Sequence, residues 1–161
     1  MKRLKIYLDT SIINFLFADD SLDFKRITED FFNEYFGRFD IFISEIVLLE
    51  INKTENQEQK SRLLNVIDKY PFQILEIRDN DDTDYLSRLY IEKGVIPTNK
   101  KEDALHIAVA TVYEMDILLS WNFKHLANIK KQIDINSINS REGYLKKLTF
   151  LSPLEVEYED E

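Results

Sequence analysis

The stretch "YLDTSIINFL", residues 7–16, joins the end of an apolar run to the start of a helix-like segment, with a single acid, Asp9, between them. The preceding residues, "LKIYL" at 4–8, predict a short buried strand. The following residues, "SIINFLF", repeat apolar side chains at the three-to-four-residue spacing of an amphipathic helix. Asp9 therefore lies directly after the first strand, which raises the question of why a buried strand should end on an acid.

Strands and helices alternate along the rest of the chain. Further strands are predicted at 40–44, 72–77, 116–120 and 148–153. Amphipathic helices are predicted at 21–39, 45–51, 58–70, 82–94, 98–115 and 123–142. The helix from 98 opens with Asn99 and, three residues later, Glu102, which is the spacing of a variant capping box. Strands that alternate with helices in this way predict an α/β fold with a parallel, helix-covered sheet.

Composition indicates a single globular domain over residues 1–161. The chain is 44% apolar, has few glycines or prolines, and ends in an acidic tail at about 154–161. It has no cysteine, which excludes disulfides and thiolate metal sites and favours a reducing cytoplasm. The first 17 residues resemble a signal peptide, but Asp9 and Asn14 interrupt the apolar run. No stretch approaches the roughly 18 apolar residues of a membrane span, so we expect a soluble protein.

The net charge of −9 opposes non-specific attraction to a nucleic acid. The charge is unevenly distributed, however. Residues 124–147 hold six lysines and arginines against Asp134 and Glu142. This segment predicts either a basic face on an acidic protein or an ordinary surface helix with solvated lysines.

Acids and an amide lie near the predicted strand ends. Asp9 follows the first strand, and Glu50 lies in the helix after the second. Asp103 is in the first turn of the apolar helix, and Asn122 comes two residues after the fourth strand. In parallel α/β sheets ligands bind beyond the carboxyl ends of the strands, so these four side chains are expected to converge on one crevice.

Each acid also has a purely structural interpretation. Asp9 is a good N-cap for the helix that follows it. Glu50 suits a solvated position on an amphipathic helix, and Glu45 is an alternative acid from the same segment. Asp103 complements the helix dipole, although Glu102 already does so.

Four blocks of the sequence together resemble the PIN domain family, notably the VapC-like toxins of bacterial toxin–antitoxin pairs: "YLDTSIINFLF", "ISEIVLLEI", "EDALHIAVA" and "DILLSWNFKHLAN". The resemblance implies a three-layer α/β/α sandwich with a mainly parallel five-stranded sheet. It also implies a metal-dependent ribonuclease with an RNA substrate and a small antitoxin partner. The family's acids fall on Asp9, Glu50 and Asp103. Many relatives have a fourth acid where this chain has Asn122.

The chemistry of phosphodiester hydrolysis explains such a cluster. Mg²⁺ or Mn²⁺ activates water and neutralises the charge that grows on the leaving oxygen, and these cations prefer oxygen ligands. Carboxylates gathered without a cation raise one another's pKa values and oppose folding. Ser11 is expected to support Asp9 by a hydrogen bond or to orient water, and Thr10 to be a local turn or cap residue. Asn122 offers an oxygen without charge, so a second metal should bind more weakly than the first.

Several other side chains are candidates for RNA contacts. Trp121, Lys124 and His125 flank Asn122 and suit stacking and phosphate contacts, and Lys130 follows in the basic segment. Trp121 is equally suited to a packing role.

His106 lies one helical turn after Asp103. It is a candidate to orient that carboxylate or to contact phosphate. A histidine in so apolar a helix is more often a hydrogen-bonded core residue.

The segment "RITEDFFNEYF", 26–36, carries more aromatic residues than one helix face needs. It is a candidate surface for the antitoxin or for a homodimer, or else a part of the core.

Two other functions compete with a nuclease. One is a catalytically silent PIN-like module that only binds RNA or protein. The other is a phosphate-transfer fold, such as a receiver or a haloacid-dehalogenase-like enzyme. Receivers carry paired acids after the first strand, and dehalogenases begin with Asp-x-Asp. "LDTS", residues 8–11, has neither pattern.

Overall fold

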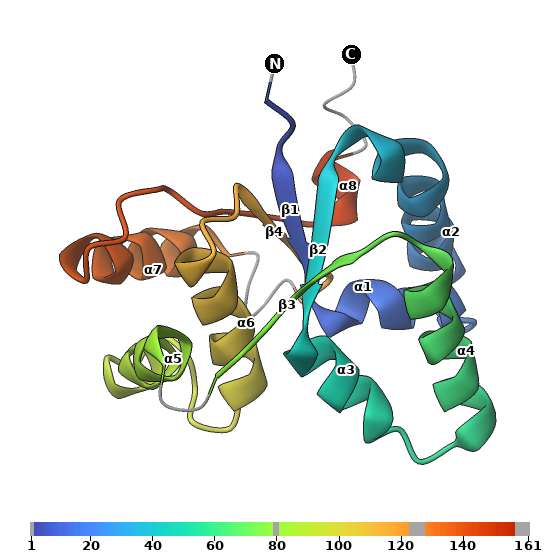
Figure 1. Cartoon of the computed structure of the whole chain (residues 1–161), viewed down its shortest axis with the longest axis horizontal. Coiled ribbons are helices and arrows are strands. Elements are labelled where there is room, and N and C mark those ends of the chain that lie inside the picture. Colours follow the sequence, from blue (N-terminus) through green and yellow to red (C-terminus); the bar gives the residue numbers. More distant parts are fainter. Residues whose placement is uncertain (1, 79–80, 123–127, 157–161) are drawn as a thin grey trace.

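The computed structural model describes residues 2–78, 81–122 and 128–156. Within them, five strands form one sheet in the order β3-β2-β1-β4-β5, and all four neighbouring pairs are parallel (Figure 1). The strands are β1 Lys5–Leu8, β2 Asp40–Ser44, β3 Gln73–Leu75, β4 Ile117–Leu119 and β5 Thr149–Leu151. The predicted α/β fold with five strands is confirmed.

Helices cover both faces of the sheet, which makes three layers (Figure 1). One layer holds α5 Asp82–Glu92, α6 Lys101–Val112 and α7 Ile129–Arg141. The other holds α1 Thr10–Asn14, α2 Leu22–Asp30, α3 Glu45–Asn52, α4 Gln57–Lys69 and α8 Pro153–Val156. Short 3₁₀ turns at Phe15–Phe17 and Phe36–Arg38 and a π-helical segment at Phe31–Tyr35 extend the α1 and α2 regions.

The two layers bury two separate hydrophobic clusters, because side chains of a strand alternate between the faces of a sheet. Tyr7 and Leu118 point into the cluster shared with α5, α6 and α7. Ile6, Leu8 and Leu119 point into the cluster shared with α1 to α4 and α8. The strands read as continuous apolar runs because both of their faces are covered.

The order of strands creates a switch point between β1 and β4. From β1 the chain continues to β2 and β3 on one side, then crosses over to β4 and β5 on the other. The segments that leave β1 and β4 therefore diverge, and a crevice forms beyond their carboxyl ends. Asp9 follows β1, and Ser120 and Asn122 follow β4.

Two helix starts differ from the prediction. Helix α6 has Lys100 as its N-cap, without a side-chain cap bond, so the predicted capping box from Asn99 to Glu102 is wrong. The helix begins one residue late for that box, and Glu102 instead supplies negative charge to the first turn. Helix α7 begins at Ile129, with Asn128 as its cap, and the earlier part of its predicted range lies outside the described residues.

The aromatic residues of 26–36 belong to the core. The buried ones are Phe31, Phe32, Tyr35 and Phe36, each exposed by 8% or less. The chain forms a π-helical turn here, which is wider than an α-turn, and the rings fold inward against Tyr70 and Phe72. The core interpretation is confirmed, and these rings offer no surface to an antitoxin or a second copy.

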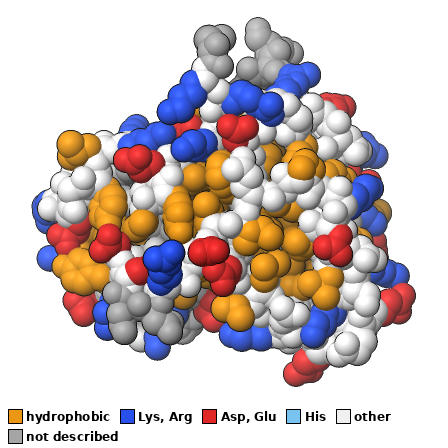
Figure 2. Space-filling view, in the orientation of Figure 1, with side chains coloured by type: hydrophobic (Ala, Val, Ile, Leu, Met, Phe, Trp, Pro, Cys, Tyr) orange, Lys and Arg blue, Asp and Glu red, His pale blue; other side chains and the backbone are white. Residues whose placement is uncertain are grey.

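Some large apolar side chains remain exposed elsewhere. Hydrophobic atoms gather near the centre of the face crossed by β3, with charged side chains around them (Figure 2). Ile74 of β3 is 46% exposed, and Leu49 of α3 is 62% exposed. Along the described ranges no helix is long and apolar enough to cross a bilayer.

Candidate active site

Asp9 lies at the carboxyl end of β1, where it is the N-cap of α1. Its Oδ1 accepts hydrogen bonds from the backbone N–H of Ser11 at 3.1 Å and from the Ser11 hydroxyl at 2.5 Å. The capping role and the predicted support from Ser11 are both confirmed. Asp9 is only 3% exposed, so capping alone would bury an expensive charge.

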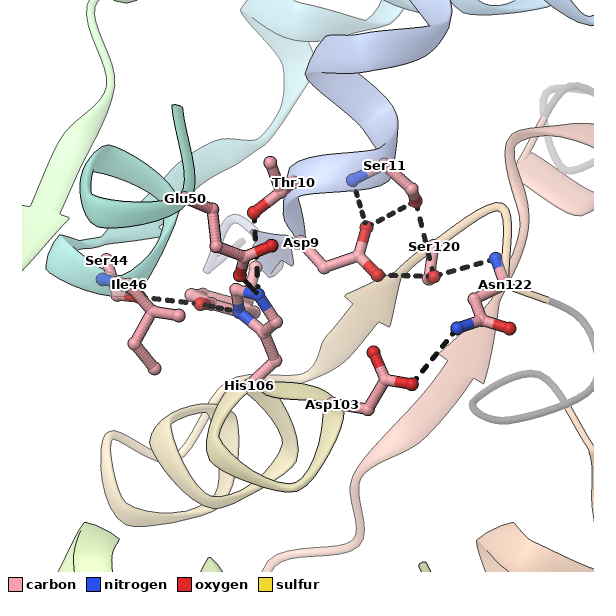
Figure 3. A network of polar contacts seen from close by, with 11 residues as sticks. Asp9, Thr10, Ser11, Ser44, Ile46, Glu50, Asp103, His106, Ser120 and Asn122 are labelled. Carbon is pink, nitrogen blue, oxygen red and sulfur yellow. Dashed lines mark hydrogen bonds and ion pairs between the residues drawn. The ribbon is translucent and has the colours of Figure 1, made fainter. Parts of the chain in front are cut away.

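A second serine ties Asp9 to the end of β4. The Ser120 hydroxyl donates to Asp9 Oδ2 at 2.5 Å, and Ser120 Oγ accepts from the backbone N–H of Asn122 at 2.9 Å. A further bond connects the α1 side to the segment after β4, because Ser11 Oγ accepts a hydrogen bond from the backbone N–H of Trp121 at 2.9 Å. These bonds join the two segments that diverge at the switch point (Figure 3).

Asn122 and Asp103 meet beside this network. Asn122 Nδ2 donates to Asp103 Oδ2 at 3.1 Å, and Figure 3 shows the Asp103 carboxyl group on the side of α6 that faces Asn122. Asp103 is held in the first turn of α6, where the helix dipole favours a negative charge. Sequence positions 19 residues apart are therefore brought together as predicted.

Glu50 reaches the site from α3 and contacts a histidine. Glu50 Oε1 lies 2.7 Å from His106 Nε2, and His106 Nδ1 lies 2.6 Å from the Tyr7 hydroxyl. His106 is thus a hydrogen-bonded core residue, as the commoner interpretation had it. Its carboxylate partner in the described hydrogen bonds is Glu50 rather than Asp103.

An open pocket of about 380 Å³ lies beside these groups, lined by Glu50, Lys53, Asn99, Lys100, Glu102, Asp103 and Asn122. Asp9 does not line it, because its carboxyl group is buried below the two serines. The pocket brings together three of the four predicted site residues. It also contains two lysines, which gives an otherwise acidic wall some positive charge.

Burial controls the protonation of the inner groups. Burial raises the pKa of Asp9, and the charge of Asp103 raises it further, while His106 and the two serine hydrogen bonds oppose the shift. Burial lowers the pKa of His106, but the hydrogen bond and charge of Glu50 together with the charges of Asp9 and Asp103 outweigh burial, so this pKa lies above its usual value. A positive charge near Asp9 would therefore relieve an unfavourable arrangement.

The donor set fits a hard divalent cation that keeps much of its water. Among the residues that the structure describes, no three carboxylate or histidine side chains stand together as a ready metal site. Each acid instead faces a protein donor: a serine, Asn122 or His106. Mg²⁺ is usually bound through only one or two carboxylates and retains several waters, so Asp9 and Asp103, with Glu50 at the pocket wall, suffice.

Two other candidate residues, Trp121 and Glu45, do not line the pocket. Trp121 is 5% exposed and packs against Phe15 and Phe24, so the packing interpretation is confirmed. Glu45 accepts a hydrogen bond from the backbone N–H of Ile77 and does not line the pocket.

Lys124 and His125 lie outside the described residues. Lys130 is exposed in the first turn of α7 and does not line the pocket. Thr10 is the first residue of α1, and its hydroxyl lies 3.5 Å from His106 Nε2.

Sequence reasoning missed four residues of this region: Tyr7, Lys53, Lys100 and Ser120. Ser120 carried a usable signal, since it follows β4 as Asp9 follows β1 and both strands were predicted. Tyr7 gave none, because a tyrosine inside an apolar strand looks like ordinary core. Lys53 lies at the end of α3 and Lys100 at the start of α6, and the packing of these helices brings both lysines to the site.

A comparison with protein families supports the geometry. The model of the PIN domain matches residues 6–130, which is more than half of the chain. The chain belongs to the PIN domain family. PIN domains are in general nucleases, and such nucleases generally use divalent metal ions.

Solved structures show the same fold as this PIN domain. One chain of VapBC2 from Rickettsia felis, bound to a DNA fragment from their promoter, matches with a TM-score of 0.58 and 19% identity, over 92% of this chain and 98% of that one. A chain of VapBC-1 from nontypeable Haemophilus influenzae matches with a TM-score of 0.57 and 17% identity, over 94% and 99%. No curated protein matches by sequence. At these identities the likeness shows the fold.

Proposed function

We propose that this PIN domain is a metal-dependent ribonuclease that acts as the toxin of a toxin–antitoxin pair. The observation that carries the proposal is Asp9: a carboxylate buried at the switch point of the sheet, held by two serines, with the charge of Asp103 nearby. A purely structural cap would not need a second acid beside it. A nuclease site that binds a cation does.

The residues divide the work between them. Asp9 and Asp103 would hold Mg²⁺ or Mn²⁺, with Glu50 at the pocket wall and Asn122 as a neutral oxygen donor beside Asp103. Once bound, such a cation activates water and neutralises the charge on the phosphate. Ser11 and Ser120 keep the Asp9 carboxylate from rotating, because each donates to a different one of its oxygens.

The test is a cleavage assay with the purified chain and a mixture of structured and single-stranded RNAs. Cleavage should appear with Mn²⁺ or Mg²⁺ and disappear with EDTA. The alternative function, a PIN-like module that is catalytically silent, predicts RNA or protein binding without cleavage under every metal condition. RNA breakage that persists in EDTA would contradict the metal-dependent mechanism.

The two pocket lysines are expected to bind the RNA backbone. Lys53 is exposed and Lys100 half-buried, and neither has an ion pair within the described part of the chain. Replacing both by alanine should weaken binding of single-stranded RNA and reduce its salt-dependence slope by about 1.4, at roughly 0.7 per lost contact. Fluorescence anisotropy over a salt series, in EDTA, measures this slope.

Two comparisons sharpen the lysine experiment. The double variant Lys60→Ala, Lys93→Ala removes the same charge away from the pocket and should leave the slope within error of the original. Lys130→Ala tests the basic segment of α7, where each phosphate contact would also change the slope by roughly 0.7. A slope altered equally by both double variants would show that only net charge matters.

Asn122 sets the strength of any second metal site. In Asn122→Asp the hydrogen bond to Asp103 is replaced by two facing carboxylates. Without metal we expect a loss of about 1 kcal/mol in the free energy of unfolding. With Mn²⁺ the added charge should lower the metal concentration needed for half-maximal cleavage. Unfolding and Mn²⁺ titrations that both match the parent would place Asn122 outside the site.

A small antitoxin is the proposed protein partner, because the solved structures with this fold include VapBC complexes. The absence of cysteine is consistent with the reducing cytoplasm in which such a pair would act. Expression of the chain alone should slow growth, and co-expression of a small protein encoded beside it should restore growth. Sedimentation velocity of the purified chain tests whether it also forms a homodimer.

A further inference from the structure

A continuous chain of polar groups runs through the core behind the pocket (Figure 3). It starts at the backbone N–H of Ile46, which donates to Ser44 Oγ at 3.2 Å, and Ser44 Oγ lies 2.7 Å from the Tyr7 hydroxyl. From there it passes to His106 Nδ1 at 2.6 Å, and His106 Nε2 lies 2.7 Å from Glu50 Oε1. Residues of β1, β2, α3 and α6 are joined in this way.

The donors in this chain can all point the same way. Ser44 Oγ accepts from Ile46, so its own proton is available to Tyr7. With a neutral imidazole the Tyr7 proton is then available to His106 Nδ1, and with an imidazolium Nδ1–H donates to Tyr7; in both forms the Nε2–H faces Glu50. Each polar atom from the Ile46 N–H to Glu50 Oε1 is satisfied by its neighbour. The imidazole is thus held from behind with an N–H directed at the carboxylate.

The exposure of its members shows that this series of hydrogen bonds runs from the buried core to the pocket. Tyr7 and Ser44 are 0% exposed and His106 is 2% exposed, whereas the Glu50 side chain is 27% exposed and lines the pocket. Apolar side chains of the same shape would fill the core as well, without the cost of burying hydroxyl and imidazole groups. Glu50 is therefore the member of the hydrogen-bonded series that reaches the pocket.

We propose that His106 is a positioning residue for Glu50, with Tyr7 and Ser44 holding it from behind. A glutamate at the end of a helix loses considerable rotamer freedom when it is held in one place. The hydrogen bond from His106 occupies Oε1, and in the described ranges Oε2 has no hydrogen-bond partner, so one oxygen is left for a ligand in the pocket. This inference rests on the proposed metal-dependent function, since it assigns Glu50 a place beside the cation.

Two variants of His106 separate positioning from packing. In His106→Gln the amide nitrogen reaches about as far as Nε2 and can still donate to Glu50. In His106→Asn the shorter amide stays near Tyr7 and loses Glu50. Partners that orient a metal ligand typically account for about 10–100-fold in metal affinity, so we expect at least tenfold weaker Mn²⁺ binding for His106→Asn and near-parental binding for His106→Gln.

A tyrosine pair provides a second, independent comparison. Tyr7→Phe releases the imidazole from behind and should also weaken Mn²⁺ binding. Tyr90→Phe is the matched control, because Tyr90 is equally buried and its hydroxyl lies 2.5 Å from Asn139 Oδ1, outside the His106 chain. It should cost a similar amount of stability and leave Mn²⁺ affinity unchanged.

The measured quantity is the affinity for Mn²⁺ in the absence of RNA. It is determined by electron paramagnetic resonance titration and by calorimetry, and the thermal unfolding of each variant is measured in parallel. Equal affinity in His106→Asn, His106→Gln and the parent would overturn the positioning role. Equal losses in Tyr7→Phe and Tyr90→Phe would do so too, and this pair decides the matter if His106→Asn does not fold. If the parent itself binds no Mn²⁺, the metal site falls, and the role of His106 with it.

Discussion

Replacing Asp9 by asparagine should reduce metal-dependent RNA cleavage by about a thousandfold. Metal-ion catalysis supplies several kcal/mol of transition-state stabilisation, and about 1.4 kcal/mol corresponds to a factor of ten in rate. Asp9 is expected to matter most because it is the acid nearest the switch point and is held by Ser11 and Ser120. Initial cleavage rates with saturating Mn²⁺, at equal concentrations of folded protein, give the factor.

A matched control separates this effect from loss of folding. Asp116 precedes β4, at the opposite end of that strand from Ser120, where it accepts a hydrogen bond from the backbone N–H of Lys5 at 2.8 Å and pairs with Lys146 at 3.0 Å. Asp116→Asn should lower stability slightly and leave cleavage unchanged. If Asp9→Asn retained cleavage within about tenfold of Asp116→Asn, Asp9 would be a helix cap and nothing more.

The sequence was sufficient to predict the five strands and the carboxyl ends of β1 and β2, whereas β3, β4 and β5 end one or two residues earlier than predicted. Strands covered on both faces are short apolar runs, and β2 was predicted at its observed bounds because Asp40 and Ser44 frame three residues of that kind. Placing Asp9 and Asn122 near one crevice followed from the parallel sheet. The proximity of Asp103 and Asn122 also followed from the parallel sheet, since the start of α6 and the end of β4 lie at the same edge of the sheet.

Contacts between side chains of different strands and helices could not be predicted from the sequence. That His106 faces Glu50 depends on β1 and β2 being neighbours and on α6 packing over them, which follows from strand order rather than from any local pattern. Likewise, Ser120 meets Asp9 only because β1 and β4 are paired in the register Leu8 with Leu119. Short-range periodicity contains no information about either contact.

The aromatic residues of 26–36 suited either a surface or the core, and the backbone geometry decides between the two. Helical periodicity assumes 3.6 residues per turn, but the π-helical segment at Phe31–Tyr35 turns more slowly and lets neighbouring rings face the same side. The excess of aromatic residues in 26–36 therefore belongs to the core and not to a surface.

Replacing Trp121 by alanine should lower the free energy of unfolding by about 3–5 kcal/mol, because large aromatic side chains removed from a core cost this much. Trp121 packs against Phe15 and Phe24, with ring centroids 5.5 Å and 4.6 Å away, and its Nε1–H donates to Thr28 Oγ1 at 2.8 Å. Since it is the only tryptophan, urea unfolding must be followed by circular dichroism.

The companion variant Trp121→Phe distinguishes packing from RNA stacking. It keeps an aromatic ring in the core and loses the bond to Thr28, so the expected loss is about 1–2 kcal/mol. Stacking of a base on an aromatic ring is worth about 1–3 kcal/mol, whereas a ring only 5% exposed has no face to offer a base. RNA affinity of the folded alanine variant, measured by anisotropy in EDTA at low temperature, should therefore match the parent. A drop in affinity of tenfold or more, with Ile133→Ala as the exposed control that changes neither property, would show that Trp121 contacts RNA after all.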